Sequence, residues 1–233
     1  MITWLYPERC PVCLKPVTPK GAMLHPECVC KLDVIKEPIC MKCGVPLASE
    51  EEEYCGECSI HSERGWDQGR SIFPYHGAVG NALRIVKKEG TREFVRFFAK
   101  QMNRSQWAFI KRMAPDCIVP VPLHPSKQRS RGFNQAELLA EALSKETNLP
   151  VRLLLIKQKK TKDQKSLSKT ERKKNVKDAF LVDEDAIGEQ VPTSVLLVDD
   201  VSTTGSTLAA CANVLKARGV ARVAYISVCV AEQ

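Results

Sequence analysis

The sequence lacks several patterns that would assign it to a common class of protein. No stretch approaches the roughly 18 consecutive apolar residues of a membrane span, and the first ten residues lack the apolar core of a signal peptide. We therefore expect a cytoplasmic protein that does not insert into membranes. There is no Gly-x-x-x-x-Gly-Lys-Ser/Thr pattern and no Gly-x-Gly-x-x-Gly pattern, which excludes the usual nucleoside triphosphatase and dinucleotide-binding loops.

Aromatic residues are also scarce, at 6% of the 233 residues, whereas 44% are hydrophobic and 27% are charged. This balance is typical of a soluble globular protein, and the length accommodates one medium-sized domain plus a small module. The formal net charge is +8. The segment from Lys157 to Lys177 holds ten basic residues against two acidic ones, so it alone carries +8 and the rest of the chain is formally neutral.

Cysteine, by contrast, is abundant and unevenly distributed. Eight of the eleven cysteines precede residue 60, in four closely spaced pairs. A two-residue gap lets two thiolates at a turn face one tetrahedral ion, and in a reducing cytoplasm such pairs favour metal binding over disulfides. The simplest assignment is two structural zinc ions, one bound by Cys10, Cys13, Cys28 and Cys30 and the other by Cys40, Cys43, Cys55 and Cys58.

The first of these quartets leaves an alternative open. The gap between Cys28 and Cys30 is tighter than usual, and His25 precedes Cys28 by three residues, so His25 could replace one sulfur. A segment so short and so poor in apolar periodicity would hardly fold without its metal. Because the cysteine density falls near residue 66, we place a boundary there, between a metal-binding module over 1–66 and a second domain over 67–233.

In the second domain, strand-like apolar runs alternate with helical periodicity. Strands are expected at 71–75, 117–121, 151–156, 179–182, 195–198 and 222–231. Helices are expected at 78–88, 91–112, 136–146 and 207–218. This alternation predicts a mostly parallel sheet with helices on both faces, and such sheets bind ligands at the carboxyl ends of their strands.

The most specific pattern lies near the C-terminus. The apolar run 195–198 ends in two adjacent acids, Asp199 and Asp200, followed by a loop of small hydroxyl residues around Gly205. Two consecutive acids at the end of a buried strand repel each other and lose solvation, which indicates a bound ligand or cation. The carboxylates suit the vicinal hydroxyls of a ribose. The hydroxyls of the loop and the N–H groups at the start of the following helix suit a phosphate.

Residues 195–207 resemble the phosphoribosyl pyrophosphate (PRPP) motif of type I phosphoribosyltransferases. The Pro-Leu-His and Arg-Gly-Phe-Asn-Gln segments within 122–135 are similar to a signature of the ComF family, phosphoribosyltransferase-like proteins linked to DNA uptake in competent bacteria. The four cysteine pairs match the double zinc ribbon of the same family. The resemblance covers nearly the whole chain, and it implies a type I phosphoribosyltransferase-like parallel sheet flanked by helices, with a small N-terminal double zinc ribbon.

The resemblance also implies a transferase that displaces pyrophosphate from PRPP onto an unidentified nitrogen acceptor, with Mg²⁺ held mainly by the PRPP itself. Asp199 and Asp200 are expected to hold the ribose hydroxyls. The loop around His124 and Lys127 is expected to hold the pyrophosphate. The candidate cations for the leaving group are Arg131 and Arg172. The candidate ligands of the 5′-phosphate are Ser202, Thr203, Thr204, Gly205, Ser206 and Thr207.

Several alternatives stay open. The basic segment 157–177 is favoured as a lid over pyrophosphate, but a nucleic-acid patch and a solvated surface segment compete with that interpretation. Lys87 is either a further basic site residue or a helix-surface lysine. Besides PRPP, the expected partners are single-stranded DNA and proteins of the competence machinery. The chain is therefore either a transferase or a non-catalytic nucleic-acid-binding protein that uses PRPP as a regulatory ligand, and the lack of aromatic residues in the basic segment favours the transferase.

Overall fold

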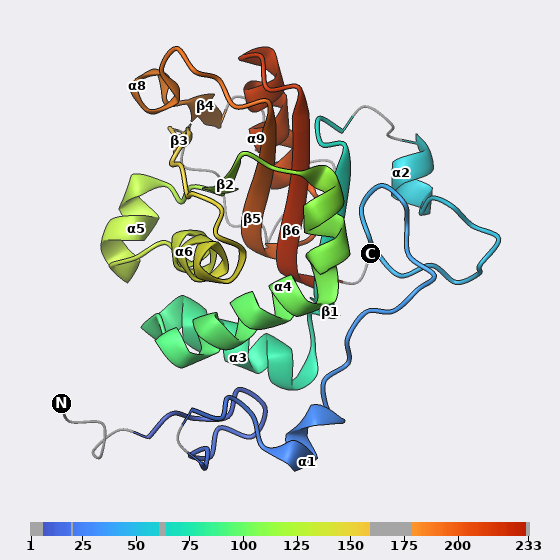
Figure 1. The fold of residues 1–233 in the computed structure, drawn as a ribbon, viewed down its shortest axis with the longest axis vertical. Coiled ribbons are helices and arrows are strands. Elements are labelled where there is room, and N and C mark those ends of the chain that lie inside the picture. Colours follow the sequence, from blue (N-terminus) through green and yellow to red (C-terminus); the bar gives the residue numbers. More distant parts are fainter. Residues whose placement is uncertain (1–6, 20, 61–63, 159–178, 232–233) are drawn as a thin grey trace.

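A four-stranded parallel sheet forms the centre of the structure, a computed structural model that describes residues 7–19, 21–60, 64–158 and 179–231 (Figure 1). The strands lie in the order β1-β6-β5-β2, and every neighbouring pair is parallel. The strand bounds are Gln68–Pro74 for β1, Cys117–Pro120 for β2, Ser194–Ser202 for β5 and Arg222–Val230 for β6. The expected parallel sheet is confirmed.

Helices cover both faces of this sheet, because successive side chains along each buried strand point to opposite sides. In β5, Leu196 and Val198 are fully buried in one core, which they share with α3, α4 and α6. Val195 and Leu197 are fully buried in the other core, which they share with α9. The helices are α3 over Gly77–Glu89, α4 over Arg92–Met113, α6 over Gln135–Thr147 and α9 over Ser206–Ala217.

The longest described helix, α4, is bent at Gln106, whose φ of −123° and ψ of 20° are not helical. One stripe of the helix, including Phe94, Phe98 and Met102, is buried against the sheet, and the opposite side is exposed. Over the described residues, no helix combines the length and the apolar character that crossing a membrane requires.

The chain after residue 150 differs from the expected strand over 151–156. Val151 forms an isolated bridge with Ile118, and the chain then leaves the main sheet. It forms β3 over Leu155–Lys157, which pairs antiparallel with β4 over Phe180–Val182 in a separate two-stranded sheet. The chain leaves the main sheet here because its apolar side chains are buried elsewhere. Leu154 and the β3–β4 sheet pack into the core beside α9, and no fifth strand joins the main sheet within the described residues.

Two short helices lie in the connections. The segment after β2, expected to be a rigid loop, contains α5 over Pro125–Arg131, with proline in its first turn. It ends at Gly132, whose φ of +83° is the left-handed conformation that glycine adopts without strain. The second helix, α8 over Glu184–Ile187, follows β4 and is capped by the side chain of Asp183.

The N-terminal module consists mainly of turns, with two short helices, α1 over Pro26–Val29 and α2 over Gly56–Ile60. Its two halves lie apart in Figure 1, one below α3 and the other beside β1, and each is built around a small core of cysteines. The second half is joined to β1 by a backbone hydrogen bond of 2.7 Å from Gly69 N to Lys42 O. The boundary near residue 66 stays a prediction.

Candidate functional site

The second half of the N-terminal module contains a group of four cysteines whose sulfur atoms all lie within 4.8 Å of one another. Gly44 follows the first pair with a φ of +70°, and its N–H donates to Cys40 O at 2.9 Å, which closes a tight turn around the sulfurs. Four thiols on two such turns fit a closed tetrahedral zinc site. The group consists of the predicted residues Cys40, Cys43, Cys55 and Cys58.

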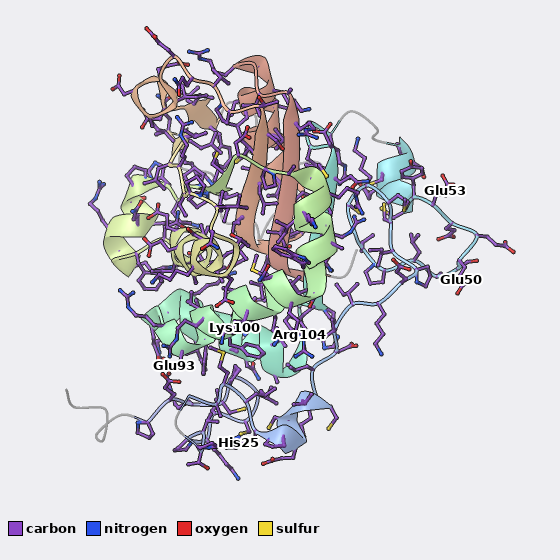
Figure 2. The ribbon with its side chains drawn as sticks, viewed as in Figure 1. His25, Glu50, Glu53, Glu93, Lys100 and Arg104 are labelled. Atoms are coloured by element: carbon purple, nitrogen blue, oxygen red, sulfur yellow. The ribbon has the colours of Figure 1, made fainter. Side chains whose placement is uncertain are left out.

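The first half contains a group of three cysteines and one histidine, Cys10, Cys13, His25 and Cys28. Figure 2 shows His25 within this half of the module. Its Nδ1 lies 3.3 Å from Cys13 Sγ, and its Nε2 lies 3.0 Å from the carbonyl oxygen of Pro16. If Nε2 donates to that carbonyl, Nδ1 is left as the ligand atom, which is the usual arrangement of a metal-binding histidine.

This geometry corrects the expectation for Cys30. Cys28 lies within the helix α1 and Cys30 is its C-terminal cap, so the two side chains point in different directions, as residues two apart on a helix do. Cys30 is exposed, and its thiol donates to Glu27 O at 3.4 Å. The sequence assigned the fourth ligand position first to Cys30 and left His25 open as the alternative. The geometry favours His25.

One thiol of this first group, that of Cys10, is favoured in its thiolate form. Burial alone would raise the pKa of the Cys10 thiol, but backbone N–H groups around it, together with His25, favour the thiolate and lower its pKa to about 6. A thiolate is the form that binds zinc. Both groups fit structural zinc, and neither leaves an open coordination position among its four ligand atoms.

A cavity of about 790 Å³ lies at the carboxyl ends of β2 and β5. It is the place where a parallel sheet is expected to bind its ligand. Because Pro120 at the end of β2 pairs with Val198 in β5, the loops that follow these two neighbouring strands open into the same space. Tyr75, which follows β1, and side chains from α3 and β3 complete its walls.

The two acids expected at the end of β5 line this cavity. Each accepts a hydrogen bond from the next backbone N–H, Asp199 Oδ1 from Asp200 N at 2.8 Å and Asp200 Oδ1 from Val201 N at 2.9 Å. Burial, reinforced by the neighbouring charge of Asp200, raises the pKa of Asp199 well above its usual range. A cation or a set of hydroxyl donors at this position would favour the ionised form of Asp199.

Lys87 on α3 supplies a cation within the protein. Its Nζ lies 2.7 Å from Asp200 Oδ2, and it also lies over the ring of Tyr75, 5.6 Å from the centroid. The contact is chiefly one of charge, because Asp200 Oδ2 accepts no well-angled hydrogen bond within the described part of the chain. Burial would lower the pKa of Lys87, but Asp200, Tyr75 and Asp199 together outweigh burial and the pKa is raised. Lys87 is thus a site residue, which the sequence left undecided.

The loop after β5 has the expected form of a phosphate cradle. Gly205, with a φ of +72°, is the N-terminal cap of α9, and the hydroxyl-bearing Ser202, Thr203 and Thr207 line the cavity together with it. The other two predicted hydroxyl groups have a different position. Thr204 Oγ1 and Ser206 Oγ lie 2.7 Å apart and hydrogen-bond each other, so they shape the turn. The N-terminal N–H groups of this twelve-residue helix favour an anion here.

The loop after β2 brings positive charge to the same cavity. His124 caps α5 by accepting from Ser126 N at 3.1 Å, and Lys127 and Arg131 line the cavity from the same helix. Asn134 fixes the end of this loop, because its side chain donates to Val121 O at 3.1 Å and accepts from the first turn of α6. The predicted cationic residues therefore share one cavity with the acid pair, with the exception of Arg172, which lies outside the described residues.

Sequence reasoning did not single out several other cavity residues, among them Tyr75, Lys88 and Lys157. Tyr75 follows β1, and Lys157 at the end of β3 lies over the ring of Phe180, 4.9 Å from the centroid. Burial lowers the pKa of Lys157. The sequence contains no local signal for Tyr75. Lys157 is the first residue of the basic segment, but only the two-stranded sheet directs it into the cavity; residues 159–178 lie outside the described part.

Comparison with known proteins identifies the relatives of this chain. A family model described as "Double zinc ribbon domain" matches residues 1–59. Competence protein F of Haemophilus influenzae is 32% identical over 197 residues, covering 82% of this chain and 84% of the relative. The chain belongs to the competence protein F, or ComF, family.

Other ComF relatives share this extent of similarity. Competence protein ComFC of Bacillus subtilis is 31% identical over 201 residues, covering 82% of this chain and 77% of the relative. The DNA utilization protein YhgH of Escherichia coli K12 is 29% identical over 195 residues, covering 82% and 83%. Among solved structures, adenine phosphoribosyltransferase of Leishmania tarentolae matches with 14% identity and a TM-score of 0.34, covering 78% of this chain and 89% of that one.

The metal groups predict different zinc contents for two nearby substitutions. We expect Cys30→Ser to leave two zinc ions per chain, because this thiol lies outside the ligand group. We expect His25→Ala to reduce the content towards one. Elemental analysis of the purified variants measures both, and Cys30→Ser with only one zinc would show that the sulfur rather than the imidazole is the ligand.

The Lys87–Asp200 pair predicts a loss of stability that the second substitution reverses. Lys87→Met leaves the buried Asp200 carboxylate without its counter-ion, and we expect the free energy of unfolding to fall by about 1–3 kcal/mol. Adding Asp200→Asn removes the buried charge and should restore part of that loss. Denaturant unfolding measures these changes. The neighbouring Lys88→Met, at an exposed position, is the control and should change stability little.

Proposed function

We propose that this cavity binds PRPP with Mg²⁺ and that the protein transfers the 5-phosphoribosyl group to a nitrogen nucleophile, releasing pyrophosphate. The single observation that carries this proposal is the convergence of an acid pair, a helix-capping hydroxyl loop and a cationic helix on one cavity of about 790 Å³. A ligand that presents vicinal hydroxyls between two phosphate groups matches all three features at once.

The placement of each ligand group follows from the charges around it. The 5′-phosphate would accept hydrogen bonds from the loop at 203–207 and from the first N–H groups of α9. The ribose hydroxyls would donate to Asp199 and Asp200, which lie near the carboxyl end of β5, just before that loop. The pyrophosphate would lie across the cavity against Lys127 and Arg131 on α5.

The donor set also fits Mg²⁺, which prefers oxygen ligands and is usually held by substrate phosphates and waters with one or two carboxylates. Asp199 and Asp200 provide the carboxylates, and the buried Asp200 Oδ2 has the Lys87 cation beside it but no well-angled hydrogen bond from the described residues. When bound, Mg²⁺ would neutralise the charge of the departing pyrophosphate.

The chemistry requires no nucleophilic side chain. The bond between C1 of the ribose and a pyrophosphate oxygen breaks, the bond from C1 to the acceptor nitrogen forms, and the acceptor loses a proton. Positive charge grows on the ribose ring and negative charge on the leaving group. Asp199 and Asp200 stabilise the first, and Lys127 and Arg131 the second, by charges that the fold holds in place before reaction.

A second candidate is a regulatory PRPP-binding protein that acts on nucleic acid without turnover. It is supported by the printed names of the relatives, which are competence and DNA utilization proteins. It is also supported by the basic residues Lys88, Lys127 and Arg131, which line one cavity and could contact a phosphate backbone. Both candidates require the same PRPP site, and they differ only in whether pyrophosphate is released.

Calorimetric titration of the zinc-loaded protein with PRPP and Mg²⁺ tests the shared site. Asp200→Asn removes a ribose contact, and we expect it to abolish Mg²⁺-dependent binding while zinc content stays unchanged. Asp185→Asn, an exposed carboxylate on α8, is the matched control and should bind as the unsubstituted protein does. Undiminished affinity of Asp200→Asn would remove the ribose assignment.

Pyrophosphate release then separates the two candidates. The protein is incubated with PRPP, Mg²⁺ and a panel of nucleobases, amines or single-stranded DNA. Release that depends on one acceptor would establish the transferase and identify its substrate class. Binding of PRPP without release under any condition would favour the regulatory protein.

A further inference from the structure

Arg64 connects the second cysteine group to the phosphate-binding loop. Its Nη2 donates to Glu57 Oε2 at 2.9 Å, and its Nη1 donates to the carbonyl oxygen of Thr204 at 3.2 Å. The Arg64 side chain is only 9% exposed, so solvent screens this bridge weakly. One guanidinium thus contacts a residue seven positions before it and a residue 140 positions after it in the sequence.

The near end of the bridge belongs to the cysteine turn. Glu57 lies on α2 between Cys55 and Cys58, two members of the second cysteine group. Closing four ligands around one ion fixes the backbone between those two cysteines. The carboxylate of Glu57 is therefore presented to Arg64 from a rigid support.

The far end of the bridge controls an N–H group. The carbonyl of Thr204 and the N–H of Gly205 belong to one planar trans peptide unit and point in opposite directions. By holding the carbonyl, Arg64 fixes the N–H so that it points away from the guanidinium, and Gly205 itself lines the cavity. This orientation makes the N–H available to an anion at the cap of α9.

Packing supports the same connection independently. A Cβ atom on Gly205 would lie 2.7 Å from the ring of Trp66 and 3.2 Å from Arg64 Nη1, so the loop rests directly on these two side chains. Trp66 is 1% exposed and meets Tyr225 edge to face at 5.1 Å. The hydroxyl of Tyr225 in turn donates to Cys43 O at 2.8 Å. Trp66 and Tyr225 therefore form a second chain of contacts between the loop and the second cysteine group.

We propose that Arg64 is a positioning residue through which the second cysteine group holds the phosphate-binding loop in its binding conformation. The inference rests on the proposed function, because it assumes that this loop binds the 5′-phosphate. It assigns to the zinc ribbon a role in ligand affinity in addition to its role in folding.

The test uses two probes that occupy different halves of the cavity. Ribose 5-phosphate carries the 5′-phosphate, and magnesium pyrophosphate represents the leaving group. Arg64→Ala should lower the affinity for ribose 5-phosphate about tenfold and leave the affinity for pyrophosphate unchanged. A tenfold loss is the order expected when a charge-assisted hydrogen bond is lost. Arg64→Lys keeps the charge but cannot form both contacts, so it should restore affinity only in part.

A double-substitution cycle isolates the bridge. Glu57→Gln removes the charge that pairs with Arg64 but leaves every cysteine in place. We expect it to lower the affinity for ribose 5-phosphate less than Arg64→Ala does. The double variant should bind no more weakly than Arg64→Ala alone, since both changes break one connection. Zinc content and unfolding are measured in parallel.

Arg9 provides the matched control. It also belongs to the N-terminal module and also contacts the α/β domain, through Glu89, Glu93 and the ring of Phe94, but it lies on the half that contains His25. We expect Arg9→Ala to leave affinity for both probes unchanged.

Three outcomes would overturn the inference, and they are distinguishable. If the unsubstituted protein binds ribose 5-phosphate and Arg64→Ala binds it equally well, the positioning role is wrong and the proposed function stands. If the unsubstituted protein binds neither ribose 5-phosphate nor PRPP, both fail. An equal loss for both probes would also overturn it, because a general effect of the lost charge or of folding would then explain the result.

Discussion

The adjacent carboxylates of Asp199 and Asp200 constrain the rest of the structure, because the fold places them where water is scarce. They lie near the carboxyl end of β5, which runs between β6 and β2 in a sheet covered on both faces. Burial and the neighbouring charge of Asp200 raise the pKa of Asp199. The protein compensates with backbone N–H donors at each acid and with the cation of Lys87 beside Asp200. The carboxylate oxygens of the two acids can still accept hydrogen bonds from hydroxyl groups or bind a metal ion, and the proposed function depends on this property.

Two other elements reach the cavity beside the acid pair. The cap of α9 and the basic helix α5 both line it, because the loops after two paired strands emerge together. A ligand with two anionic ends and a hydroxylated centre satisfies all of these groups, whereas a simple anion would leave the acids uncompensated. Trp66 and Arg64, which follow the second cysteine group in the sequence, pack against Gly205 at the edge of this arrangement.

Local features of the site could be predicted from the sequence, since they depend on neighbours along the chain. The acids, Gly205 and the cysteine turns are of this kind, and each lies where its local pattern indicated. The choice between His25 and Cys30 depended on the orientation of the four-residue helix α1, which spacing alone does not fix. Thr204 and Ser206 were assigned to the ligand because their sequence pattern does not reveal that their hydroxyls pair with each other.

Other contributions could not be predicted because they depend on tertiary placement. Tyr75, Lys87 and Lys157 come from three separate elements and meet the acids only when the sheet and its helices are assembled. The expected strand over 151–156 failed for a related reason, since apolar composition does not distinguish a fifth strand from a chain that crosses to a separate small sheet.

Determining the structure of the zinc-loaded protein with PRPP and Mg²⁺ bound tests the central claim most directly. We expect the 5′-phosphate at residues 203–207, the ribose hydroxyls on Asp199 and Asp200, and the pyrophosphate against α5. PRPP bound elsewhere, or bound in this cavity with its ribose away from the acid pair, would contradict the claim.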